Sequence, residues 1–126
     1  MKSERSGNIL VIDDERDIVD TLTLMLKARD YTVSSALDGQ EGLEKAKNER
    51  PNLILLDIVM PGIDGYNVCM KLKSDRETRN IPVVIVSAKA ERESILKCHS
   101  IGASDFIVKP FNFPTLLGKL GRLISK

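Results

Sequence analysis

Two short apolar runs that each end in acidic residues constrain the fold of this chain more than any other feature. The run Ile9–Ile12 is followed directly by Asp13 and Asp14, and the run Leu53–Leu56 by Asp57. Continuous apolar runs between helical patterns are typical of strands buried on both faces of a parallel sheet. A carboxylate that follows such a strand lies at the carboxyl edge of the sheet, where open α/β folds bind ligands. Three acids meeting there repel one another unless a cation neutralises them, so they form a candidate site.

The spacing of apolar residues predicts five units of a strand followed by a helix. The expected strands are Asn8–Ile12, Thr32–Ala36, Leu53–Leu56, Val83–Val86 and Asp105–Val108. The expected helices run from about Glu15 to Ala28, from Gln40 to Asn48, from about Asp64, from Glu91 to Ser100 and from Asn112. Asp14 is placed to cap the first helix, and Asn112 the last. Five such units predict an α/β fold, a three-layer sandwich around a parallel five-stranded sheet with right-handed crossovers.

Length, charge and cysteine content narrow the class of protein. A chain of 126 residues predicts one domain over residues 8–126, preceded by a flexible polar lead-in over residues 1–7 that lacks a signal-peptide core. The net charge of +1 favours neither nucleic-acid nor membrane-surface binding. The apolar runs are far shorter than the roughly 20 residues that cross a bilayer. Cys69 and Cys98 form no metal-ligand pattern, which is typical of a reduced, cytoplasmic protein.

Two more of the expected strands end in a polar residue. Ser87 follows Val83–Val86, and Lys109 follows Asp105–Val108. Taken singly, each candidate has a plainer interpretation. An aspartate after a strand is often a helix cap or a loop acid. A serine there is often only a strand-end hydroxyl, and a lysine only a solvated side chain. Four such strand ends in one chain, however, place groups that handle cations and anions along one edge of the sheet.

The residues around these strand ends resemble the receiver domains of two-component response regulators, over essentially the whole length of the chain. The resemblance is carried by Val-Ile-Asp-Asp-Glu at 11–15, Leu-Leu-Asp-Ile-Val-Met-Pro-Gly-Ile-Asp-Gly-Tyr at 55–66, Val-Ser-Ala-Lys at 86–89 and Gly-Ala-Ser-Asp-Phe-Ile-Val-Lys-Pro-Phe at 102–111. It implies a doubly wound, flavodoxin-like sheet of order 2-1-3-4-5. In that order the first and third strands are neighbours, which brings the three acids together.

The resemblance also implies a chemistry. Asp57 would be the phosphoacceptor, taking a phosphoryl group from the phosphohistidine of a sensor histidine kinase or phosphotransfer protein. Such a chain is a signalling switch that catalyses only its own phosphorylation and dephosphorylation. A Mg²⁺ ion (or Mn²⁺) would be held by Asp14, Asp57 and the backbone carbonyl of Val59, with Asp13 acting through a water molecule.

The remaining roles implied by the resemblance concern the phosphoryl group and the signal. Lys109, the Ser87 hydroxyl and the Ala88 backbone N–H would contact phosphoryl oxygens, and the Lys109–Pro110 bond would be cis. Ser87 and Phe106 would form the switch. The residues that modulate the rate would be Val59 and Lys89.

The resemblance further implies where partners bind. The surface made by the fourth helix, the fifth strand and the fifth helix would signal to an output domain or protein, or form a phosphorylation-dependent dimer. The first helix and Pro110-Phe111 would dock the kinase. Neither nucleic acid nor a membrane is an expected direct partner.

Two other functions share parts of this pattern. A phosphohydrolase of the haloacid-dehalogenase type also uses a strand-end aspartate, but it has a second acid where this chain has Val59. A flavodoxin-like cofactor-binding module needs a phosphate-binding loop after the first strand, where this chain has Asp-Asp-Glu. His99 is interpreted as a surface residue of a helix.

Overall fold

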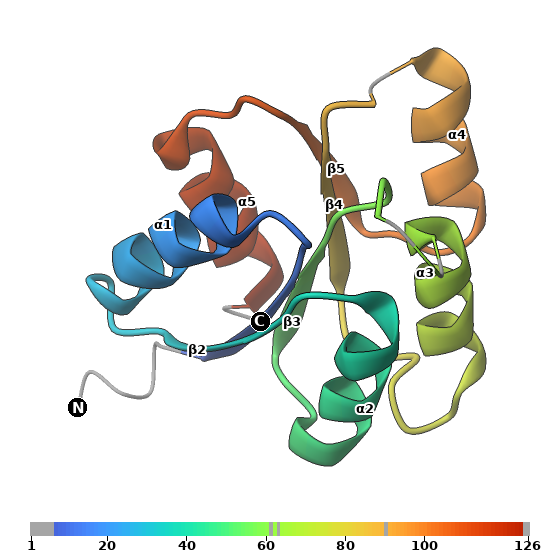
Figure 1. The fold of residues 1–126 in the computed structure, drawn as a ribbon, viewed down its shortest axis with the longest axis horizontal. Coiled ribbons are helices and arrows are strands. Elements are labelled where there is room, and N and C mark those ends of the chain that lie inside the picture. Colours follow the sequence, from blue (N-terminus) through green and yellow to red (C-terminus); the bar gives the residue numbers. More distant parts are fainter. Residues whose placement is uncertain (1–6, 61, 63, 90, 125–126) are drawn as a thin grey trace.

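The computed structural model describes residues 7–60, 62, 64–89 and 91–124, so most of the expected lead-in lies outside the described residues. Within them five strands alternate with five helices (Figure 1). Their bounds are β1 Asn8–Ile12, α1 Arg16–Lys27, β2 Thr32–Ala36, α2 Gly39–Glu49, β3 Leu53–Leu56, α3 Gly65–Ser74, β4 Val83–Ser87, α4 Arg92–Ser100, β5 Asp105–Val108 and α5 Phe113–Ile124. None of these helices is long and apolar enough to cross a membrane.

All the strands of the described residues pair in parallel, in the order β2-β1-β3-β4-β5. This confirms the expected α/β sandwich and its strand order. Helices α1 and α5 cover one face of the sheet, and α2, α3 and α4 cover the other (Figure 1). Strands β1 and β3 lie side by side inside the sheet, and β5 is an edge strand with β4 as its neighbour. The carboxyl ends of the strands therefore share one edge.

The buried strands divide their side chains between two cores, as a period of two requires. On β1, Leu10 and Ile12 belong to the core beneath α2, α3 and α4. Ile9 and Val11 belong to the core beneath α1 and α5. All four side chains are at most 1% exposed. A strand packed on both faces is held firmly, so the groups at its end are held firmly too.

The starts of the helices differ slightly from the expected ones. Helix α1 begins at Arg16, with Glu15 in the cap position and no side-chain cap bond. The prediction that Asp14 caps this helix was therefore wrong. The reason is that the Asp13 carboxylate accepts the Glu15 N–H at 2.9 Å, which moves the turn one residue along the chain. The prediction for α5 is confirmed, because the Asn112 side chain accepts the Thr115 N–H at 2.8 Å.

The two cysteines lie in the same buried core, Cys69 on α3 and Cys98 on α4, and neither forms a disulfide. Burial raises the pKa of the Cys69 thiol to about 11 and also raises that of Cys98. Only the thiolate reacts readily with disulfide reagents, so both the low thiolate fraction and the burial oppose reaction.

We expect an aromatic disulfide reagent at pH 8 to leave both thiols of the folded protein unmodified over minutes, and to label both at once in guanidinium chloride. The released chromophore measures the reaction. The variant Cys69→Ala should show one slow thiol in place of two. Rapid labelling of the folded protein would contradict the packing of α3 and α4 described here.

Candidate functional site

The acids of the candidate site are positioned by backbone hydrogen bonds at the ends of β1 and β3. Ile12 pairs with Leu56 in the parallel register. The Asp57 N–H then donates to the Ile12 carbonyl at 3.0 Å, and the Asp13 N–H donates to the Ala36 carbonyl of β2 at 3.1 Å. The sheet ladder thus extends to the first residue beyond each strand. Both aspartates inherit the fixed geometry of the sheet.

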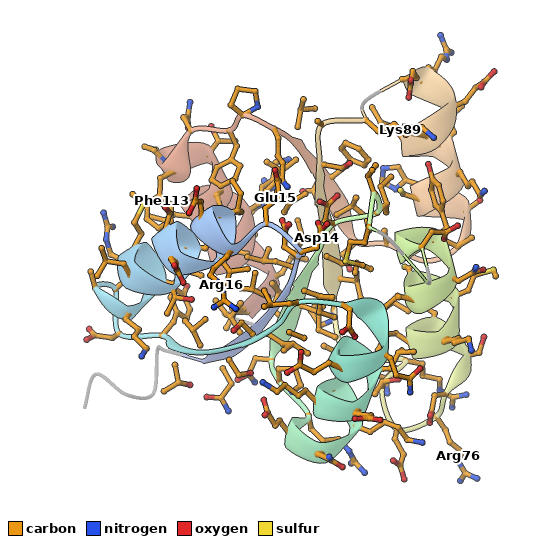
Figure 2. The ribbon with its side chains drawn as sticks, viewed as in Figure 1. Asp14, Glu15, Arg16, Arg76, Lys89 and Phe113 are labelled. Carbon is orange, nitrogen blue, oxygen red and sulfur yellow. The ribbon has the colours of Figure 1, made fainter. Side chains whose placement is uncertain are left out.

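The structure brings the three acids together, as the sequence led us to expect. Carboxylate oxygens of Asp13, Asp14 and Asp57 all lie within 4.8 Å of one another. Asp13 and Asp57 are buried, 3% and 5% exposed, whereas Asp14 is exposed. Figure 2 shows Asp14 beyond the end of β1, at the edge of the sheet where the strands end.

Lys109 reaches this cluster from the end of β5. Its Nζ lies 2.9 Å from Asp13 Oδ2, 3.1 Å from Asp57 Oδ2 and 2.7 Å from Glu15 Oε1. The Lys109 side chain is only 10% exposed, and its backbone N–H donates to the Ser87 carbonyl at 3.0 Å. The Lys109–Pro110 bond is cis, as the resemblance implied. One ammonium therefore joins residues that follow β1, β3 and β5.

The charges of the cluster set the protonation of the lysine. Burial acts to lower the pKa of Lys109, but hydrogen bonds to Glu15 and Asp13 and the charges of Asp13 and Asp57 more than offset it. The pKa of Lys109 is therefore raised above its usual 10.5. For Asp13 the effect of burial has the opposite sign, because the charged form is the anion: burial raises the pKa of Asp13, and the hydrogen bond from the Glu15 N–H and the charge of Lys109 act against this rise. Because the pKa of Lys109 is raised by folding, its ion pairs stabilise the fold below about pH 10.5 and are lost only as the pH rises further.

Glu15 is a member of this cluster that the sequence analysis did not single out. Its side chain is 59% exposed, and yet it makes the shortest of the three contacts to Lys109. The sequence feature that could have pointed to Glu15 is its position directly after Asp13-Asp14, within the first motif shared with receiver domains. Figure 2 shows Glu15 next to Asp14, at the start of α1.

A pocket of ≈ 440 Å³ opens beside the acids. It is lined by Asp14, Glu15, Asp57, Val59, Ala88, Lys89 and Lys109. Most of the residues expected at the site therefore line this one pocket. The Val59 N–H donates to Asp57 Oδ1 at 3.0 Å, and the Val59 side chain is 56% exposed.

The two expected switch residues, Ser87 and Phe106, stand apart from the pocket. Ser87 is fully buried, and its Oγ accepts the Lys89 N–H at 3.1 Å. Among the described residues, no hydrogen bond joins the Ser87 side chain to Asp57 or Lys109. Phe106 is half-buried and packs against the core beneath α2, α3 and α4. The exposed His99 lies on α4.

A close backbone contact holds the segment that follows Asp57. The Gly65 N–H donates to the Ile58 carbonyl at 3.1 Å. A Cβ atom at Gly65 would lie 2.2 Å from Ile58 Cα and 2.4 Å from the Asp57 carbonyl oxygen. These are backbone atoms that cannot swing aside. The start of α3 can therefore lie this close to Asp57 only because residue 65 is glycine.

Comparison with known proteins finds a family model and relatives that are similar to this chain over most of its length. The family model for the response regulator receiver domain matches residues 9–121. The response regulator PleD of Caulobacter vibrioides is 43% identical over 118 residues, which cover 94% of this chain and 26% of PleD. The DNA-binding dual master transcriptional regulator RpaA of Synechocystis is 34% identical over 118 residues, which cover 94% of this chain and 49% of RpaA.

A solved structure gives the same result for the fold. The chemotaxis protein CheY4 of Vibrio cholerae superposes with a TM-score of 0.88 at 29% identity, covering 94% of this chain and 98% of that chain. The curated relatives are longer, and the chain spans about a quarter of PleD and about half of RpaA.

The contact at Gly65 generates a stability prediction. We expect Gly65→Ala to lower the free energy of unfolding by about 1–3 kcal/mol, because the new methyl group displaces backbone beside Asp57. The control is Gly118→Ala in α5, where a Cβ atom meets nothing within 4 Å. That change should raise stability, by up to about 1 kcal/mol, because alanine favours helix. Urea denaturation measures both, and an unaltered midpoint for Gly65→Ala would refute the close approach.

Proposed function

The chain belongs to the response regulator receiver domain family, and from this premise we propose that Asp57 accepts a phosphoryl group from a phosphohistidine of a sensor histidine kinase or phosphotransfer protein. The observation that carries the proposal is the position of Lys109 Nζ, 3.1 Å from Asp57 and 2.9 Å from Asp13. A carboxylate beside a permanent cation, at the rim of an open pocket, suits a nucleophile that must receive an anion.

The transfer itself needs little beyond position and charge. A carboxylate oxygen of Asp57 attacks phosphorus in line, and the electron pair of the phosphorus–nitrogen bond returns to the imidazole. Both the nucleophile and the phosphoryl group are negative, so neutralisation is the main requirement. Lys109 supplies one positive charge. The sheet holds Asp57 still, which reduces the entropy lost on reaching the reactive geometry.

A divalent cation is the second proposed source of positive charge. The three carboxylates, with oxygens within 4.8 Å of one another, are the hard ligands that Mg²⁺ or Mn²⁺ prefers. Asp14 and Asp57 would bind the ion directly with the Val59 carbonyl, and Asp13 through water. Val59 lines the same pocket as Asp14 and Asp57, so the proposed ligands fit one ion. When bound, the ion supplies charge neutralisation for the phosphoryl oxygens.

The phosphoryl group is proposed to be sensed on the side of β4. The Ala88 N–H and the Ser87 hydroxyl would each donate to a phosphoryl oxygen. Ser87 Oγ now accepts the Lys89 N–H, a bond that does not use the hydroxyl's own O–H donor. The inward movement of Ser87 would let Phe106 move deeper into the core it already touches. Strand β5 with α4 and α5 is the proposed signalling surface, for an output partner or a dimer.

The magnitudes require several contacts to act together. A switch from 1:99 to 99:1 needs about 5.5 kcal/mol of differential stabilisation. One hydrogen bond to a charged group contributes about 1.5–3 kcal/mol. Ser87 alone is therefore insufficient, and Lys109 and the cation would have to contribute as well.

A neighbouring groove supports a docking site for the phosphohistidine partner. The groove lies between α1 and the segment after β5, with Ile18, Met25, Phe111 and Phe113 among its lining residues. It shares Glu15, Ala88 and Lys109 with the site pocket. A helical partner seated in this groove could therefore present its phosphohistidine to Asp57. The proposed setting is the cytoplasm, where thiols such as Cys69 remain reduced.

Two residues at the mouth of the pocket are proposed to set the lifetime of the phosphoryl group. The Val59 and Lys89 side chains are exposed and line the pocket. There they would limit the access of an attacking water molecule to the phosphoryl group. The same position of Val59 argues against a phosphohydrolase of the haloacid-dehalogenase type, because an apolar side chain cannot serve as a general acid. The three acids likewise argue against a flavodoxin-like module, because they would repel the phosphate of a free cofactor.

The proposal predicts that Asp57→Ala abolishes acyl-phosphate formation from a small phosphodonor such as acetyl phosphate with Mg²⁺. Asp17→Asn on the exposed side of α1 removes the same charge outside the site and should label as fully as the unchanged protein. The measurement is the amount of phosphate bound to the protein that survives acid but is removed by hydroxylamine, followed by mass spectrometry of the intact chain. Retained label in Asp57→Ala would assign the acceptor to another residue.

The proposed switch predicts that Ser87→Ala still forms the acyl phosphate but responds to it weakly. Without the hydroxyl, the phosphoryl group loses the contact that draws β4 inward. Amide chemical shifts in β5 and α4, recorded with and without the phosphodonor, measure the response. Ser87→Thr keeps a hydroxyl and should restore part of it. If the chemical-shift changes in Ser87→Ala were as large as those in the unchanged protein, Ser87 would have no role in the switch.

A further inference from the structure

Strand β2 is an edge of the sheet, and half of its backbone groups face away from β1. The Asp13 N–H donates to the Ala36 carbonyl at 3.1 Å, so the even-numbered residues of β2 bond to β1. Successive residues of a strand direct their N–H and C=O groups to opposite sides, so those of Val33 and Ser35 point outward. The N–H of Leu37, just beyond the strand, points outward too. An outward row of this kind is a template for pairing with another strand.

Two side chains of α2 occupy outward groups at the carboxyl end of β2. Lys45 Nζ donates to the Ser35 carbonyl at 2.5 Å, and Glu41 Oε1 accepts the Leu37 N–H at 3.2 Å. Lys45 and Glu41 also form an ion pair at 3.4 Å, one helical turn apart. Within the described residues, the Ser35 N–H and the N–H and C=O of Val33 have no hydrogen-bond partner. The edge is therefore closed at one end and open in its middle.

The occupied groups are the ones that a second copy of β2 would need. Two β2 strands can pair in antiparallel fashion about a twofold axis at Ser35. That register joins the two Ser35 residues to each other, and Val33 of each copy to Leu37 of the other. Lys45 holds the acceptor of the Ser35 bonds, and Glu41 holds the donor that Leu37 would offer. The strand itself, Thr-Val-Ser-Ser-Ala, has no charge and no proline to prevent pairing, so its protection comes from α2.

Charge acts in the same direction as the hydrogen bonds. Lys45 contacts Ser35, so in the paired register the Lys45 ammonium groups of the two copies would meet near the axis. Like charges that face each other across an interface oppose its formation. The Lys45 side chain is 34% exposed, so a strand approaching this edge would also remove it from water.

We propose that Lys45 and Glu41 guard the free edge of β2 and so prevent a second copy of this chain from adding its own β2 to the sheet. The guard needs no ligand and goes beyond the proposed function of Asp57. It leaves the other faces of the molecule, including the proposed signalling surface, for any dimer that accompanies phosphorylation.

The test compares Lys45→Ala with Lys47→Ala by sedimentation over a wide range of protein concentrations, without a phosphodonor. Each variant removes one lysine of α2 and one ion pair of 3.4 Å, but Lys47 is paired with Asp75, which follows α3. Lys45→Ala should lower the dissociation constant for self-association about tenfold, because each of the two copies loses an ionic contact that pairing would displace. Lys47→Ala should sediment as the unchanged protein does, and so should Lys45→Arg, which keeps a cationic donor. Equal sedimentation of Lys45→Ala and Lys47→Ala at every concentration would overturn the proposal.

Hydrogen exchange identifies the surface through which Lys45→Ala associates. The Ser35 N–H faces water in the monomer and should exchange more slowly in the associated variant. The Ser34 N–H lies within the ladder to β1 and should exchange at the same rate in both states. Ser35→Pro removes the outward N–H without breaking that ladder, so in the Lys45→Ala background it should restore the monomer. Association that leaves the exchange of the Ser35 N–H unchanged, or that persists in the Ser35→Pro variant, would overturn the assignment to β2.

Discussion

The structure depends on the neutralisation of buried carboxylates by a single ammonium. Asp13 and Asp57 are almost fully removed from water, and Lys109 Nζ lies within 3.1 Å of both. In an environment of low dielectric constant, such a pair of acids is tolerable only beside a cation. Lys109 stands 96 residues from Asp13 in sequence. The fold of the sheet, which brings these distant residues together, therefore serves the charge balance as well as packing.

The surrounding fold serves to keep these charges in place. The parallel register fixes the backbone of Asp13 and Asp57, and the two cores hold β1 and β3 from both faces. Gly65 lets α3 lie against the segment after Asp57. The proposed transfer by charge neutralisation would benefit from such rigidity, because groups that are already oriented need little rearrangement when an anion arrives.

Much of this arrangement could be predicted from the sequence, for identifiable reasons. Buried parallel strands leave continuous apolar runs, which located β1, β3 and β4, whereas the less buried β2 and β5 were located from the alternation of strand and helix patterns. Only β4 is longer than expected, by Ser87. The order of the strands came from the family resemblance, since periodicity carries no information on neighbours. The cap of α1 was mistaken because the Asp13 side chain, rather than that of Asp14, bonds to the start of the helix region. The contact between Glu15 and Lys109 joins residues 94 apart, and no local pattern reports such a contact.

The position of β5 in the sheet gives the site a mechanical asymmetry. Strands β1 and β3, which carry the acids, are each hydrogen-bonded to two neighbouring strands, whereas β5, which carries Lys109, is bonded to β4 alone. Displacing an inner strand disrupts its backbone hydrogen bonds to two neighbouring strands, whereas displacing the edge strand disrupts those to one. The backbone that carries the carboxylates is therefore held more firmly than the backbone that carries the ammonium. Under the proposed function, a phosphoryl group arriving between them would therefore displace the β5 side of the molecule more readily than the inner strands.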